Sequence, residues 1–134
     1  MAPRIFNTLC LMILFIPKIS EARVIDSCYD KPDALGIVMC FSDKVDKAKS
    51  DYNTTRKRYI TSVSKMTSDY KIFKQKEEKV TVEWMKLVEK DCDMRAMSAG
   101  EEDGEAYNTA YLECVLNRYN ERTASYENFF VKKD

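Results

Sequence analysis

The distribution of glycine and proline constrains this chain more than any other feature of its sequence. No glycine or proline stands between Gly36 and Gly100, and neither residue occurs again after Gly104. Because these two residues are the strongest interruptions of helices, the blocks between them can be helical over long stretches. Apolar residues within the blocks recur every three or four positions, with Lys, Glu and Asp dense in between, as in amphipathic helices. The sequence therefore predicts an all-α fold.

The N-terminus carries the pattern of a secretory signal peptide. Arg4 precedes a mostly apolar run over residues 5–16, which is shorter than the ~20 residues of a membrane-spanning helix. The tripeptide SEA at residues 20–22 places small side chains three and one positions before a cleavage site. We expect removal of the signal peptide, residues 1–22, to leave a secreted protein with a single helical domain over residues 23–134 and no membrane insertion.

Four cysteines remain once the signal peptide, which contains Cys10, is removed: Cys28, Cys40, Cys92 and Cys114. An even number of cysteines in a small secreted chain is typical of a disulfide framework, because a small core gains from covalent crosslinks. A zinc site is the alternative, but the sequence has no histidine and no C-x-x-C pair, which structural zinc sites commonly use. We therefore predict two disulfides, with no bound metal or cofactor.

We expect a small disulfide-stapled bundle of about four helices. The first begins at residues 30–33, and an apolar position then recurs every seventh residue, at Val38, Val45, Tyr52, Tyr59, Met66 and Phe73. One helix over this whole pattern would be about 54 Å long, more than the diameter of a compact domain of this size. We therefore predict a turn at residues 51–55, where Asp, Asn and Thr disfavour helix. A long helical hairpin is the alternative.

Three further helices complete the predicted bundle. The second runs from Arg56 to about Tyr70. The third buries one apolar stripe, which consists of Val80, Trp84, Leu87, Val88 and Cys92. The polar run KQKEEK at residues 74–79 is either a turn or the exposed first turns of this third helix. Gly100 and Gly104 then provide the turn into the last helix.

The pairing of the four cysteines is less constrained than their number, since three pairings exist. In an up-down-up-down bundle the first and last helices are neighbours. Cys40 and Cys114 would then lie at similar heights on these two helices. We therefore prefer the bridges Cys40–Cys114 and Cys28–Cys92.

The stretch DYNTTRKRY, residues 51–59, admits three interpretations. The sequon N-T-T begins at Asn53, and at an exposed turn of a secreted protein it would be an accessible site for N-glycosylation. Residues 56–58 form the basic run RKR, but the chain as a whole balances 22 basic with 22 acidic residues. It therefore lacks the broad positive field of nucleic-acid-binding proteins. We predict no nucleic-acid partner and interpret the basic run as a solvated helix face.

The residue content argues against an enzyme. Without histidine, the chain cannot form a Ser-His, Cys-His or HExxH arrangement, and cysteines in disulfides offer no thiolate. Its few glycines form no phosphate-binding loop. We therefore predict a non-enzymatic protein, and we expect it to be a monomer.

Two segments are candidates for binding a partner protein. The first is an acidic turn that contains Glu101, Glu102, Asp103 and Glu105. The second is an aromatic tail that contains Phe129 and Phe130. Exposed aromatic side chains are common anchors of protein interfaces. The acidic turn has an alternative role as a helix cap, because negative charge is favourable at a helix N-terminus. The aromatic tail has an alternative role as a flap over the core.

The spacing Cys28-x11-Cys40-x51-Cys92-x21-Cys114 and the segment AYNTAYLECVLNRYNERTASYENFF resemble the small salivary proteins of anopheline mosquitoes that include albicin and anophensin. The likeness covers nearly the whole chain after the signal peptide and rests on overall pattern, with no short diagnostic motif. It implies a disulfide-linked helical protein that blocks a plasma protease cascade of the vertebrate host. The target would be the alternative-pathway convertase of complement, or else factors of the contact and kallikrein–kinin system.

A carrier similar to insect odorant-binding proteins is the other alternative. Such carriers are also secreted, helical and disulfide-linked, and they hold a small hydrophobic ligand in an apolar cavity. That family usually has six cysteines with a C-x3-C element, and this chain has neither. We therefore place the carrier second to the cascade inhibitor.

Overall fold

The computed structural model describes residues 27–131. A short helical segment at residues 27–29 precedes three long helices: α2 over Ala34–Ser64, α3 over Tyr70–Met97 and α4 over Glu105–Val131. No strand occurs in this part of the chain, so the predicted small, disulfide-stapled all-α bundle is confirmed. The predicted signal peptide, residues 1–22, lies outside the described residues.

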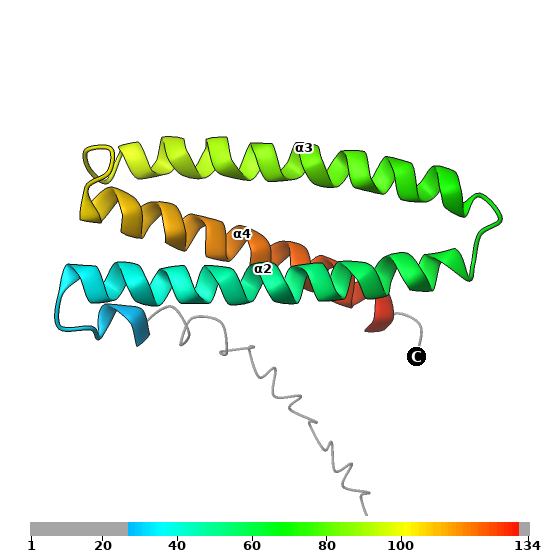
Figure 1. Cartoon of the computed structure of the whole chain (residues 1–134), viewed down its shortest axis with the longest axis horizontal. Helices are drawn as coiled ribbons and strands as arrows, with labels where there is room; N and C mark the ends of the chain where they lie inside the picture. The colour runs from blue at the N-terminus through cyan, green and yellow to red at the C-terminus, as the bar shows by residue number, and fades with distance from the viewer. Residues whose placement is uncertain (1–26, 132–134) are drawn as a thin grey trace, which may run out of the picture.

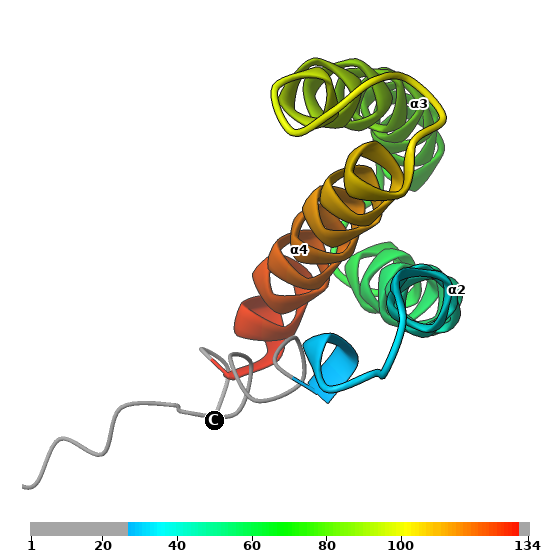
Figure 2. The same ribbon diagram turned by 90° about the vertical axis from the view of Figure 1, so that its left-hand side faces the viewer.

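The helix α4 lies between α2 and α3 and packs against both (Figure 1). The view along the bundle shows α4 running obliquely between the other two (Figure 2). The helices α2 and α3 contact each other much less than either contacts α4, and they converge toward the turn at residues 65–69. Within residues 27–131, no helix has the length and apolar character needed to cross a bilayer.

The helix α2 continues without a break through residues 51–55, so the predicted turn there is wrong. Tyr52 and Thr55 of this stretch are buried, and Lys47 forms an ion pair with Asp51 one turn away, at 2.6 Å. Packing of these side chains overrides the weak helix propensity of the stretch. With 31 residues, α2 is about 46 Å long. A helix of this length fits because the bundle is elongated rather than spherical.

The chain reverses at residues 65–69 instead, and α3 begins at Tyr70. The polar run at residues 74–79 therefore lies in the first turns of α3, which was one of the two predicted possibilities. The predicted start of the first helix is confirmed, since the Asp33 side chain caps α2 by accepting a hydrogen bond from the Gly36 amide at 2.6 Å.

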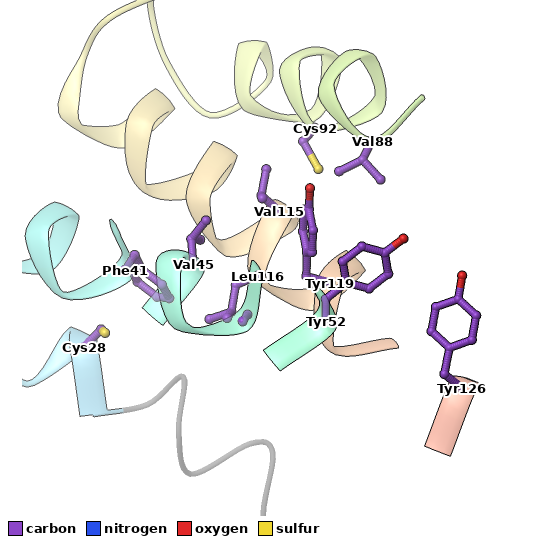
Figure 3. Close-up of a cluster of buried hydrophobic side chains, with 11 residues drawn as sticks. Cys28, Phe41, Val45, Tyr52, Val88, Cys92, Val115, Leu116, Tyr119 and Tyr126 are labelled. Atoms are coloured by element: carbon purple, nitrogen blue, oxygen red, sulfur yellow. The ribbon is translucent and has the colours of Figure 1, made fainter. Parts of the chain in front are cut away.

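The core lies along α4 and is rich in aromatic rings (Figure 3). Tyr52 of α2 is central to it, with ring centroids 5.3 Å from Trp84 of α3 and 5.4 Å from Tyr119 of α4. The predicted core position of Trp84 is therefore confirmed. Val80 and Leu87 belong to the same predicted stripe but are 49% and 64% exposed, because α3 packs mainly against α4 and contacts α2 much less.

The four cysteines among residues 27–131 form disulfides, as predicted, but the preferred pairing is wrong. The bridges are Cys28–Cys40 and Cys92–Cys114, each with Cα atoms 5.5 Å apart. The first forms because the segment before α2 folds back along that helix, where Tyr29 packs edge-on against Phe41 at 5.4 Å. The second forms because the consecutive helices α3 and α4 are direct neighbours (Figure 1). The preferred pairing depended on a four-helix order that included the incorrect turn.

Candidate functional site: an arginine–aromatic surface

A polar network joins the three helices near the 65–69 turn. Glu77 of α3 accepts hydrogen bonds from Arg56 Nε of α2 at 2.9 Å and from the Tyr126 hydroxyl of α4 at 2.9 Å. The Thr81 hydroxyl, one turn further along α3, donates to the same carboxylate at 3.0 Å. Arg56 also donates through Nη2, so this arginine holds both carboxylate oxygens. These contacts link α2, α3 and α4 through one side chain.

Glu77 stays ionised in this network. Burial by itself would raise the pKa of its carboxyl group, but the hydrogen bonds from Arg56, Tyr126 and Thr81 outweigh burial and lower the pKa below its ordinary value. Both carboxylate oxygens are occupied by donors within the protein. Glu77 is therefore a structural carboxylate and not a free acid or base.

The same end of the bundle carries an open surface of arginine and aromatic side chains. We call it the arginine–aromatic surface and define it by six residues: Arg58, Tyr59, Arg122, Tyr126, Phe129 and Phe130. Four of them, together with Ser125 and Asn128, line a hollow of about 440 Å³. Arg122, Tyr126 and Phe129 share one face of α4 because they are four and three residues apart.

The predicted aromatic tail forms one edge of this surface. Phe129 packs edge-on against Tyr59 of α2, with ring centroids 4.9 Å apart. Phe130 contacts Phe129 and lies 4.3 Å from the Arg58 guanidinium, a cation–π contact. Both phenylalanines are half-buried. They are therefore helical residues packed on α2 and only partly available to a partner.

Arg122 is the side chain of this surface with the most unused binding capacity. Its guanidinium lies 5.5 Å from the Trp84 ring and 5.4 Å from the Tyr126 ring, which hold it in place. Its buried Nε has no hydrogen-bond partner, and no ion pair involves it within residues 27–131. By contrast, Arg56 and Arg118 are each paired with a carboxylate. Arg122 therefore combines a fixed positive charge with free N–H donors.

Sequence reasoning missed Arg122 and Tyr59 as site residues. The only available signal was the spacing of Arg122, Tyr126 and Phe129 on one helix face, which is equally typical of an ordinary core helix. Tyr59 lies on α2, and nothing in the sequence indicates that it meets α4 there.

The predicted acidic turn lies at the opposite end of the bundle. Glu101, Glu102 and Asp103 are exposed in the turn between α3 and α4, and Glu105 stands in the first turn of α4, as the helix-cap alternative expects. Asp103 has a positive φ of 65°. Glu105 and Phe129 are separated by 24 residues of helix, or about 36 Å. The structure therefore does not bring the two predicted partner-binding segments together.

The predicted glycosylation site, Asn53, is exposed in the middle of α2 and not at a turn. Across residues 27–131, no cluster of three or more potential ligands is arranged to hold a metal ion. Comparison of the chain with known protein families, with curated proteins and with solved structures found no match.

Proposed function

We propose that this protein is a secreted, non-enzymatic inhibitor of a host plasma protease cascade, with the alternative-pathway convertase of complement as its first target. The cysteine spacing and the C-terminal segment that resemble anopheline salivary proteins support the choice of cascade. The disulfides are consistent with an extracellular protein. The mode of action we propose is direct contact with a protein complex.

The single observation that best supports inhibition by direct contact is the environment of the Arg122 side chain. This arginine is fixed over two aromatic rings, has no carboxylate partner among residues 27–131 and borders an open hollow beside Phe129. Arginine, tyrosine and other aromatic residues dominate the energetic centres of protein interfaces. A guanidinium that is already oriented loses little conformational freedom when a partner's acceptor binds to it. The arginine–aromatic surface is therefore our candidate contact site.

The rigidity of the bundle supports the same mechanism. Two disulfides and the Glu77 network restrict the motion of the helices that carry the surface. A preorganised surface binds with a smaller entropic cost than a flexible one. Such a protein can occlude part of a large complex without any catalytic step.

Lysis of rabbit erythrocytes in serum that contains magnesium but no calcium isolates the alternative pathway and tests this proposal. We expect the protein to inhibit lysis at micromolar concentration or below. Arg122→Gln and Phe129→Ala should each weaken inhibition at least tenfold, as changes at an interface centre do. The matched control is Arg95→Gln, which changes an exposed arginine near the opposite end of α3 and should leave inhibition unchanged.

Two outcomes would overturn parts of the proposal. No inhibition of lysis would remove complement as the target, and a parallel assay of kallikrein generation on an activating surface would then decide for or against the contact system. Equal effects of Arg122→Gln and Arg95→Gln would reject the arginine–aromatic surface as the contact site. If the protein inhibited neither cascade, the proposal of an inhibitor would be rejected. A small hydrophobic ligand that stays bound in native mass spectrometry would then support the carrier instead.

A further inference from the structure

A groove separates α2 from α3 about halfway along the bundle, and α4 forms its floor. Its volume is about 200 Å³. Six side chains define it for the present argument: Lys49 and Asn53 on α2, Met85 and Glu89 on α3, and Tyr111 and Tyr119 on α4. No residue lines both this groove and the hollow of the arginine–aromatic surface.

The sequon at residues 53–55 has an unusual place in this structure. Asn53 is exposed on the edge of the groove, whereas Thr55 is buried. Because a helix turns about 100° per residue, side chains two positions apart point about 200° away from each other. The acceptor amide of Asn53 and the hydroxyl of Thr55 therefore face opposite sides of α2.

This geometry is incompatible with glycosylation of the folded protein. The transferase recognises the asparagine amide together with the hydroxyl two residues later, so both groups must be presented to one active site. In α2 the residue Thr55 is only 7% exposed and lies on the side of the helix opposite Asn53. A transfer to Asn53 would therefore have to occur before α2 has formed.

The order of the helices along the chain favours a period during synthesis in which the sequon is not yet helical. Most of the stability of a helix in a protein comes from tertiary packing, and the stretch around Asn53 has weak helix propensity. Tyr52 and Thr55 are buried chiefly by α4, which follows them in the chain by about 50 residues. Until α4 has been made, the sequon lacks the packing that holds it helical.

We propose that Asn53 is N-glycosylated before the bundle folds, and that its glycan then lies over the α2–α3 groove and closes this face to partners. The donor is an oligosaccharide linked to a lipid diphosphate. A bond forms between Asn53 Nδ2 and C1 of the first sugar as the bond from C1 to the phosphate oxygen breaks. The amide proton passes to a base of the transferase, and the lipid diphosphate is the leaving group.

The groove is chemically suited to lie beneath sugar residues. The hydroxyls of Tyr111 and Tyr119 and the carboxylate of Glu89 form no hydrogen bond or ion pair with protein groups in the described part of the chain. These groups can donate to and accept from sugar hydroxyls. Met85 and the tyrosine rings provide apolar contact for the faces of the sugars.

Expression of the full chain in secreting insect cells tests whether Asn53 is modified. We expect the wild-type protein to show a glycan mass that a peptide N-glycosidase removes and that Asn53→Gln lacks. Thr55→Ser is the matched control, because it keeps the sequon and a hydroxyl at position 55, and it should retain the glycan. An unmodified Asn53 in the wild-type protein would overturn the proposal.

The order of events is tested with purified transferase and its lipid-linked donor. The folded, disulfide-bonded protein made in bacteria should not be glycosylated, whereas the same chain after reduction and unfolding should be. The two samples carry the same sequon and differ in folding and in the state of their disulfides. Efficient glycosylation of the folded protein would show that the order is wrong.

Methionine oxidation tests whether the glycan covers the groove. Met85 is 43% exposed in the groove, and Met94 is 66% exposed elsewhere on the same helix. With hydrogen peroxide, we expect Met85 to oxidise at least threefold more slowly in the glycosylated protein than in Asn53→Gln, while Met94 is unchanged. Equal rates at Met85 would reject the covering, and none of these results depends on which cascade the protein inhibits.

Discussion

At the end of the bundle near the 98–104 turn, covalent bonds join Cys28 to Cys40 and Cys92 to Cys114. At the end near the 65–69 turn, Glu77 holds the helices through hydrogen bonds from Arg56 and Tyr126. We call these the disulfide end and the network end. Neither disulfide connects α2 with α3, whereas the Arg56–Glu77 pair does. The contact between α2 and α3 at the network end therefore includes an ionised side chain, even though the protein is crosslinked.

The largest expected effect is the loss of Glu77. Glu77→Ala leaves the Arg56 charge and the Tyr126 hydroxyl without their acceptor in a partly buried site, and removal of one member of a buried ion pair costs about 4 kcal/mol. Urea denaturation with the disulfides intact measures the change. Glu83→Ala, an exposed change on the same helix, should cost less than about 0.5 kcal/mol. If the two variants were equally stable, the network end would contribute little.

The next largest effect is the loss of the Cys92–Cys114 bridge. This disulfide spans a sequence separation of 22, and its removal should cost about 3 kcal/mol according to the chain-entropy description. Urea denaturation of Cys92→Ala/Cys114→Ala at neutral pH measures the cost. The matched double variant at Cys28 and Cys40 opens a shorter loop, with a separation of 12, and should cost slightly less. If the variant at Cys28 and Cys40 lost more stability than the variant at Cys92 and Cys114, loop length would not determine how much each disulfide stabilises the protein.

The smallest expected effect is a pH dependence to which Glu77 of the network end contributes. The pKa of Glu77 is lower in the folded protein than its ordinary value, so its contribution to stability is complete above the unfolded pKa of about 4.3. That contribution is lost as the pH falls through the folded pKa. Unfolding free energies measured at several values between pH 7 and pH 2 should therefore decrease toward acid.

The control for this prediction is Glu77→Gln, which should show a shallower decrease toward acid than the wild-type protein. The variant without Cys92–Cys114 should keep the wild-type slope, because disulfides do not titrate in this range. An unchanged slope in Glu77→Gln would show that other carboxylates, such as Asp91 with its lowered pKa beside Arg118, account for the acid sensitivity.

The two ends also differ in how far the sequence predicted them. The cysteines of the disulfide end and the turn at Gly100 and Gly104 were expected from residue type alone. Nothing local indicated that Arg56 and Tyr126 would meet at Glu77, because these residues lie on three different helices. Phe129 and Phe130 were predicted as site residues from their chemistry, whereas Arg122 became a candidate only when Trp84 was found beside it.

The incorrect turn at residues 51–55 has a specific physical cause. The helix propensities of Asn and Thr are only about 0.5 kcal/mol per residue less favourable than that of alanine. Burial of one large side chain such as Tyr52 contributes about 2 kcal/mol. The packing of Tyr52 against Tyr119 and Trp84 therefore outweighs the local preference.

The sequence by itself determined that this protein is helical, where α2 begins and that the four cysteines after residue 27 pair. These properties depend on residues close together in the chain, through backbone interruption, capping and composition. The tertiary structure decided which cysteines pair, where α2 ends, and which side chains form the Glu77 network, the groove and the arginine–aromatic surface. Each of these depends on contacts between helices, and such contacts are set by the joint packing of side chains that are far apart in the sequence.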